Sequence, residues 1–440
     1  MTETLTKDQQ KAADLFVNFI LDPNQKEMIL TGGGGTGKTF LIRYLADLLN
    51  TKVKDTCTLL GLERKYYYVM FTATTNKAAT VLREKLSRGD TIHSVLGLKV
   101  QNDFRTGTTY LTRTSAWGTH SYCLVFIDEC SMIDQELYNY IHEALDNTCK
   151  IVYVGDKNQL VPVKSGLSPV FKNNLPMAEL NEVVRFSGSK ELLTLAEQLK
   201  DTVETGKFYP IQLKPGVIDL LNADDMENTI STIFSNPNNN SRIVAYTNDR
   251  VITYNQFIRH DIRHYKLPYE QNEKVIVNSP YIPEGKKLAL YHTEDELTIT
   301  KINPVETNFV VRAQINNTIS IKGYLATVYC SDQINGQKSL FLPSDIVDVR
   351  NKIKFYGKCK AWNHYFTLKD RVIDVRPRDA CTIHKIQGTT LDSVFIDLND
   401  LSTCRNPDTV ARLLYVACTR PKTRIYFYGN LSKKYGGIVK

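Results

Sequence analysis

The sequence predicts an α/β protein with two parallel-sheet domains, into which a β-hairpin and a small all-β unit are inserted. Apolar runs alternate with helix-like segments toward both ends of the chain, whereas residues 273–370 carry a series of short β-like runs. Strands separated by helices pair in parallel and form a sheet that is covered on both faces. A chain of 440 residues is also long enough for several domains of ordinary size.

The first parallel-sheet domain is expected at residues 1–180. The runs EMIL, YYYVMFTAT, CLVFIDE and KIVYVGD have the composition of buried strands, and a helix-like segment follows each of them. Between residues 95 and 121, β-prone Tyr and Thr residues flank a turn at Gly107 instead. This change of pattern predicts a β-hairpin inserted into the first domain.

The second parallel-sheet domain is expected in two pieces, residues 181–272 and 371–440. The segments RIVAYTNDRVITYNQFI, ACTIHKIQGTTLDSVFIDL and RLLYVACTR resume the alternation of strand and helix. Between the two pieces, residues 273–370 contain KVIVNSPYI, ELTITKI, NFVVRAQI and SLFLPSDIVDV, whose alternating apolar residues predict short strands. We therefore expect a small all-β insertion, folded as a barrel, within the second domain.

The composition favours a soluble protein of a reducing compartment. The nine cysteines form no C-x-x-C pair and no Cys/His cluster at zinc spacing, which predicts free thiols. The chain has no secretory signal pattern and no apolar run of membrane-spanning length, so a cytoplasmic location is expected. The formal net charge of +8 permits a nucleic-acid partner without requiring one.

The segment TGGGGTGKTF has the spacing of a P-loop and lies between a predicted strand and a predicted helix. Glycines let the loop wrap phosphates, so that its N–H groups and the helix N-terminus face negative charge. Lys38 is expected to reach the β- and γ-phosphates of ATP, and the Thr39 hydroxyl to hold Mg²⁺. The predicted nucleotide-binding residues of this loop are Gly32, Gly33, Gly34, Gly35, Thr36, Gly37, Lys38, Thr39 and Phe40.

Two acidic residues end the predicted strand CLVFIDE, at the sheet edge where the P-loop is also expected. Asp128 can hold the Mg²⁺, and Glu129 can orient and deprotonate the attacking water. Gln159, after the next strand, is a candidate γ-phosphate sensor. Arg185 and Arg420 are candidates for the positive charge that the transition state needs, although each by itself also fits an ordinary surface position.

In their order along the chain, these motifs resemble those of the superfamily 1B DNA helicases, the RecD-like group. The matching segments are LTKDQQKAA, the P-loop, FTATTNKAATVL, TIHSVL, IDECSM, GDKNQL, LNEVVRF, VAYTNDRV, CTIHKIQGTTLDSVFID and LLYVACTR, which span residues 5–420. The resemblance implies two RecA-like domains, 1A and 2A, that clamp ATP between them. It also implies a pin hairpin, 1B, at residues 95–121 and an SH3-like domain, 2B, at residues 273–370.

The resemblance further implies roles for single residues. Gln9 is expected at the adenine base, and Gln387 with Gly388 near the nucleotide or the domain interface. Arg185 and Arg420 match family arginines that contact the γ-phosphate from the second domain. The resemblance therefore makes both arginines catalytic candidates, together with Lys38, Asp128, Glu129 and Gln159.

The residues expected at single-stranded DNA lie mostly in the matched motifs. A motor that reads every sequence holds phosphates and base faces rather than base edges. The residues with suitable side chains are Thr75, Asn76, His93, Thr247, Asn248, Thr382 and His384, and helix capping is the alternative reading for each. Asn76 departs from the family pattern, which often has His or Gly at this position. Phe104 or Tyr110 is expected as the wedge of the pin, and Trp362 as a stacking platform.

The function that the resemblance implies is ATP-dependent DNA unwinding with 5′ to 3′ movement on single strands. Single-stranded DNA and forked or tailed duplex are the expected substrates, in phage-type replication or recombination, and a monomer is expected. A single-strand-binding protein or replisome components are further partners to test. Two alternatives stay open: an ATP-dependent accessory subunit with weak unwinding of its own, and an RNA helicase.

Overall fold

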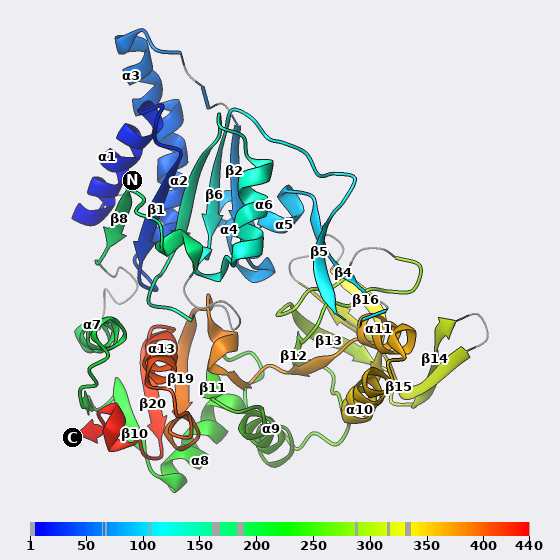
Figure 1. The fold of residues 1–440 in the computed structure, drawn as a ribbon. Coiled ribbons are helices and arrows are strands. Elements are labelled where there is room, and N and C mark those ends of the chain that lie inside the picture. Colours follow the sequence, from blue (N-terminus) through cyan, green and yellow to red (C-terminus); the bar gives the residue numbers. More distant parts are fainter. Residues whose placement is uncertain are drawn as a thin grey trace.

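The computed structural model describes residues 5–439 except 64, 67, 104, 107, 161–167, 183–188, 287–288, 315–316 and 331–335. The chain forms two parallel sheets, one antiparallel sheet and a projecting hairpin (Figure 1). In Figure 1 the first parallel sheet, blue to teal, lies above the second, green to red. The predicted fold class is confirmed. Among the described residues, no helix is both long and apolar enough to cross a membrane.

The first parallel sheet has six strands in the order β3-β2-β6-β7-β1-β8. Its strands are β1 (Glu27–Gly32), β2 (Tyr68–Ala73), β3 (Asp90–Thr91), β6 (Cys123–Asp128), β7 (Lys150–Gly155) and β8 (Met177–Leu180). One face is covered by α1 (Lys7–Leu21), α2 (Lys38–Asn50), α3 (Lys52–Leu60) and α4 (Asn76–Leu86). The other face is covered by α5 (Ile92–Val95) and α6 (Gln135–Ala144). Apolar side chains on both faces of β6 explain why it reads as one unbroken apolar run.

The hairpin consists of β4 (Leu98–Asn102) and β5 (Thr109–Arg113), which pair in antiparallel register from Leu98 and Arg113 to Asn102 and Thr109. It lies within the range predicted for the pin and extends toward the third sheet (Figure 1). The Asn102 side chain donates a hydrogen bond to Asp370 at 2.7 Å, which ties the hairpin to that part of the molecule. The predicted turn residue Gly107 lies outside the described residues.

The second parallel sheet has five strands in the order β10-β20-β19-β11-β18. Its strands are β10 (Ile218–Leu221), β11 (Arg242–Ala245), β18 (Ala380–Thr382), β19 (Leu391–Asp397) and β20 (Pro421–Tyr428). The helices packed around it are α7 (Lys190–Thr205), α8 (Ala223–Phe234), α9 (Asn248–Phe257), α12 (Leu398–Leu401) and α13 (Pro407–Cys418). A short parallel pair, β9 (Ile211–Gln212) and β21 (Ile438–Val439), lies beside this sheet.

The third sheet is antiparallel and lies between the two chain segments of the second parallel sheet. Its strands are β12 (Lys274–Val277), β13 (Glu296–Ile302), β14 (Thr307–Gln314), β15 (Asn317–Tyr329), β16 (Gln337–Pro343) and β17 (Val375–Pro377). Two helices, α10 (Ile346–Lys358) and α11 (Trp362–Arg371), form a helical hairpin that packs on β14 to β16. The sequence pattern predicted the antiparallel strands but not these two helices.

Candidate nucleotide site and DNA face

The P-loop connects β1 to α2, and its backbone requires glycine at two positions. Gly35 and Gly37 have φ angles of +91° and +81°, in the left-handed region that glycine adopts without steric cost. The Lys38 ammonium donates hydrogen bonds to the carbonyl oxygens of Gly32 at 2.7 Å and Gly33 at 3.0 Å. The predicted loop therefore has the P-loop conformation, with its lysine lying over the loop.

Gln9 supports this loop from α1. Its side-chain amide donates to the Thr36 carbonyl at 3.1 Å, and its side-chain oxygen accepts from the Thr6 backbone N–H at 3.1 Å in a capping box. A Cβ atom on Gly37 would lie 2.7 Å from the Gln9 amide nitrogen, so this approach needs glycine. The structure thus joins Gln9 to the P-loop backbone, and its contact with adenine stays a prediction.

Asp128 and Glu129 lie together at the end of β6, beside the P-loop lysine. The Glu129 backbone N–H donates to Asp128 Oδ1 at 2.9 Å, and Glu129 has a φ angle of +54°. Burial raises the pKa of Asp128. Burial, together with the charge of Asp128, raises the pKa of Glu129 to about 7, although Lys38 and Arg420 oppose this rise. A carboxylate that titrates near neutral pH suits proton transfer from water.

Arg420 reaches the P-loop from the second domain. Its guanidinium is buried and donates to the Val416 carbonyl at 3.1 Å and the Thr419 hydroxyl at 2.8 Å. A Cβ atom on Gly34 would lie only 2.5 Å from Arg420 Nη2. Burial lowers the pKa of Arg420, while Glu129 opposes the shift. The structure therefore brings this predicted arginine to the nucleotide loop, whereas Arg185 lies outside the described residues.

Two further residues of α13, which the sequence analysis missed, join the second domain to the first. The Tyr415 hydroxyl donates to Asp156 Oδ2 at 3.0 Å and lies near Gly33, where a Cβ atom would be 2.7 Å away. Arg412 Nη1 donates to the carbonyl oxygens of Lys157 at 3.0 Å and Gln159 at 2.9 Å. Polar residues at i and i+3 of an otherwise apolar helix were the sequence signal that could have indicated this interface.

Two glutamines have buried amide atoms without partners among the described residues. Gln159 donates to Asp156 Oδ2 at 3.1 Å, but its side-chain oxygen accepts no hydrogen bond. Both polar atoms of the Gln387 side chain are buried and unpartnered. Buried polar groups are normally paired, so these atoms are available for a ligand or for a closed form of the cleft.

A cavity of about 750 Å³ lies between the two parallel-sheet domains, beside the P-loop. A cavity of this size is in the range of small-molecule and cofactor sites. Thr39, Phe40, Asp128, Glu129, Gln159, Gly388 and Arg420 line it, together with residues of α4 and of the antiparallel sheet.

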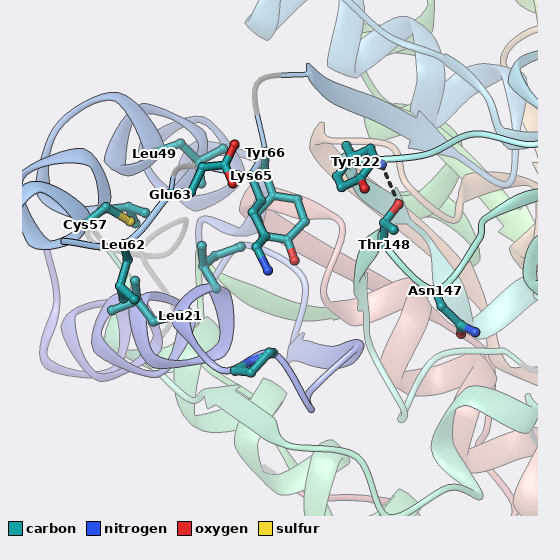
Figure 2. Close-up of a pocket in the computed structure, with 13 residues that line it drawn as sticks. Leu21, Leu49, Cys57, Leu62, Glu63, Lys65, Tyr66, Tyr122, Asn147 and Thr148 are labelled. Carbon is teal, nitrogen blue, oxygen red and sulfur yellow. Dashed lines mark hydrogen bonds between the residues drawn. The ribbon is translucent and has the colours of Figure 1, made fainter. Parts of the chain in front are cut away.

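A second cavity, of about 340 Å³, lies away from this site, between α1, α3 and the N-terminal ends of β6 and β7 (Figure 2). Its walls include Leu21, Cys57 and Tyr66, and the Tyr122 N–H donates to the Thr148 hydroxyl at 2.7 Å on its far side. None of the predicted site residues lines this cavity.

The residues predicted at DNA occupy the loops after several strands. Thr75 and Thr247 are the N-caps of α4 and α9, and Asn76 and Asn248 are the first residues of these helices. The Thr247 hydroxyl also donates to Asp400 at 2.8 Å, which gives it a structural role. Thr382 and His384 lie at the 3₁₀ helix η4 (Ile383–Ile386), which follows β18.

The other predicted DNA residues that the structure describes lie on three different elements. His93 is in α5, where burial lowers its pKa. Tyr110 is exposed on β5 of the hairpin, and Phe104 lies outside the described residues. Trp362 begins α11 and contacts Tyr365 edge-on, with ring centroids 5.6 Å apart. The DNA contacts of all these residues stay predictions.

The chain matches two family models: the AAA domain over residues 4–210 and the UvrD-like helicase C-terminal domain over residues 379–428. It is 24% identical over 464 residues to the ATP-dependent DNA helicase dda of Enterobacteria phage T4, covering 97% of this chain and 99% of that protein. It is 30% identical over 174 residues to the ATP-dependent RecD2 DNA helicase of Deinococcus radiodurans, covering 39% of this chain and 21% of that protein.

Solved structures share the fold. The Bacteroides Pif1 helicase in complex with ADP-AlF3 and single-stranded DNA superimposes with a TM-score of 0.53 at 16% identity, covering 100% of this chain and 95% of that one. A Pif1 structure at forked double-stranded DNA gives the same TM-score at 17% identity, with 100% and 94% coverage.

A P-loop on one parallel-sheet domain, approached by an arginine from a second such domain, defines a tandem-domain nucleotide hydrolase of the helicase class. The ordered motifs and the full-length similarity identify the class more narrowly. In its ordered motifs the chain is similar to the superfamily 1B helicases of the RecD-like group, and over nearly its whole length it is similar to the phage T4 helicase dda.

Proposed function

We propose that this protein is an ATP-dependent DNA helicase that moves 5′ to 3′ on single-stranded DNA and unwinds duplex DNA. The observation that carries the proposal is the approach of Arg420, in the second domain, to Gly34 of the P-loop. A nucleotide in this cleft would contact both domains, so its hydrolysis would change their separation. Repeated changes of separation move a strand that lies across both domains.

The residues present fit a magnesium-nucleotide complex. Mg²⁺ prefers oxygen ligands and is bound through one or two protein groups plus phosphates. Asp128 and Thr39 line the cavity with such oxygens beside Lys38. In our proposal Thr39 and Asp128 hold the ion, which neutralises charge on the phosphates, and Glu129 accepts the proton of the attacking water.

The proposed substrates are single-stranded DNA and tailed or forked duplex. We assign the role of strand-separating pin to the hairpin β4–β5; this is supported by its projection from the first domain and by the hydrogen bond from Asn102 to Asp370 of α11. Tyr110 is the exposed aromatic residue of this hairpin within its described part. A role in phage-type replication or recombination is supported by the phage relative and stays part of the proposal.

The experiment that tests the nucleotide site is ATP hydrolysis by the wild type and by Lys38→Ala, with and without single-stranded DNA. The wild type should hydrolyse ATP faster on DNA, and the variant should lose this activity by about 100-fold or more. Full DNA-stimulated turnover by Lys38→Ala would refute the assignment. Circular dichroism of both proteins controls for folding.

A further inference from the structure

Glu294 belongs to the antiparallel insertion but lines the nucleotide cavity of the parallel-sheet domains. It lies in the turn just before β13. Its carboxylate accepts from Arg376 Nη2 at 2.8 Å and from Lys385 Nζ at 2.6 Å. Arg376 is on β17 and Lys385 is in η4, so one side chain joins the insertion to the second domain.

The first domain approaches Glu294 through Lys77 of α4. Lys77 lines the same cavity and, within the described part of the chain, makes no ion pair of its own. Burial lowers the pKa of Lys77 to about 8, and the negative charge of Glu294 opposes this shift. Burial would raise the pKa of Glu294, but the charges of Arg376, Lys385 and Lys77 outweigh it and leave the pKa lowered. Lys77 from the first domain and Glu294 from the insertion therefore line the same cavity with opposite charges.

The backbone conformation of Glu294 indicates that surrounding contacts hold this residue in place. Its φ angle is +72°, in the left-handed region that side chains other than glycine rarely adopt. Such a conformation persists where surrounding contacts hold it, and it is common at functional sites. The Glu294 N–H donates to the Val277 carbonyl at 2.8 Å, which fixes the turn on β12.

We propose that Glu294 is a positioning residue that links α4, η4 and the β insertion across the nucleotide cleft and so favours the closed cleft. The inference rests on the proposed function. ATP is bound tightly only where both domains contact it, and its apparent affinity falls in proportion to the fraction of closed molecules. Loss of the link therefore weakens nucleotide binding, while the reacting groups at Lys38, Glu129 and Arg420 stay in place.

The test is Glu294→Gln, which removes the charge and keeps the size of the side chain. We expect KM for ATP and Kd for a fluorescent ADP to rise about fivefold or more, because couplings between sites commonly lie in this range. The value of kcat at saturating ATP should change less than twofold, since the interaction contributes equally to the ground state and the transition state.

Glu284→Gln is the control. Glu284 pairs with Arg371 at 3.5 Å, and neither residue lines the nucleotide cavity. The control removes the same charge from the same insertion, so it should leave the nucleotide Kd within twofold of the wild type. Equal increases in Kd for both variants would overturn the proposal, because they would reflect the charge lost and not the link.

A double-mutant cycle with Lys77→Met tests the link directly. Lys77→Met should raise the nucleotide Kd by itself, and adding Glu294→Gln should raise it little further. If the two substitutions instead raise the nucleotide Kd by independent factors, so that the double variant shows their product, the proposal is overturned. The Kd for ADP is measured without turnover, so it tests the link even if the wild type fails to unwind DNA, a result that would instead refute the proposed function. Thermal unfolding confirms that each variant is folded.

Discussion

Arg420 Nη2 would lie 2.5 Å from a Cβ atom placed on Gly34, so the second domain contacts the P-loop through this arginine. The guanidinium has little freedom to move away because it is buried and donates to Val416 and Thr419. A single methyl group at residue 34 therefore changes the position of a predicted catalytic charge.

The Gly34→Ala variant should lose about 100-fold or more in the kcat of ATP hydrolysis, since a displaced cation no longer stabilises the transition state. Steady-state hydrolysis on single-stranded DNA measures this effect. Gly118→Ala is the control, because a Cβ atom on Gly118 meets nothing within 4 Å. Equal, near-wild-type rates for both variants would show that Arg420 does not act at the nucleotide.

The raised pKa of Glu129 predicts a pH dependence of activity. A general base must be deprotonated, so kcat/KM for ATP should rise as the pH increases through about 7, the pKa of this carboxyl group. A pH–rate profile between about pH 5.5 and 9 tests this, because that range spans the titration of the carboxyl group. If kcat/KM for ATP is as high at pH 5.5, about 1.5 units below that pKa, as it is at pH 9, the role of Glu129 as general base is contradicted.

The raised pKa of Glu129 also predicts the direction in which the free energy of unfolding changes with pH. The pKa of Glu129 is about 7 in the folded protein, against an ordinary value of 4.5 for a glutamate, so the folded state holds the proton more tightly. The free energy of unfolding should therefore fall as the pH rises from 4.5 to about 7 and then level off, as far as this group contributes. Urea unfolding of wild type and Glu129→Gln measures the difference, and the variant should lack this decline.

Substitution of Lys150, which lies far from the nucleotide site, should have a large effect on stability. Its buried ammonium donates to the carbonyl oxygens of Asp22 and Gln25, both at 2.6 Å, and of Phe19, near the end of α1. Lys150→Met should lower the free energy of unfolding by about 2–4 kcal/mol, because these carbonyl groups lose a charged donor. Exposed Lys26, which donates to Asn147, provides the control Lys26→Met, expected within about 0.5 kcal/mol of the wild type.

Removal of the Tyr415 hydroxyl should lower ATP hydrolysis, whereas removal of a comparable buried hydroxyl away from the domain interface should lower stability alone. Tyr415→Phe removes its hydrogen bond to Asp156 across the domain interface, so DNA-stimulated hydrolysis should fall several-fold. Tyr435→Phe removes a comparable buried bond, to the Cys404 carbonyl at 2.7 Å, within the second domain alone. Each variant should lose about 1 kcal/mol of stability. Similar activities for the two variants would contradict the importance of the interface.

The sequence predicted the parts of the fold that depend on local patterns. The apolar runs around Leu30, Phe126 and Val152 form the buried strands that their composition indicated, because strands covered on both faces need apolar residues throughout. The P-loop followed from glycine spacing for a similar reason, since its backbone conformation is local.

The parts that the sequence could not predict depend on contacts between distant segments. The helical hairpin at Ile346–Arg371 mixes aromatic, β-branched and lysine residues, so its local pattern favours neither helix nor strand. Tyr415 and Arg412 contact the first domain only after both domains have folded, and their polar groups within α13 do not by themselves tell which segment they contact. The link between Glu294 and Lys77 joins residues more than 200 positions apart and was likewise missed.

Strand separation on two partial duplexes, identical except for a 5′ or a 3′ single-stranded tail, is the most direct test of the central claim. With ATP and Mg²⁺ under single-turnover conditions, the account predicts unwinding from the 5′ tail only. Unwinding only from the 3′ tail would contradict the assigned direction. ATP hydrolysis on single strands with neither duplex opened would contradict the helicase function and favour an accessory subunit.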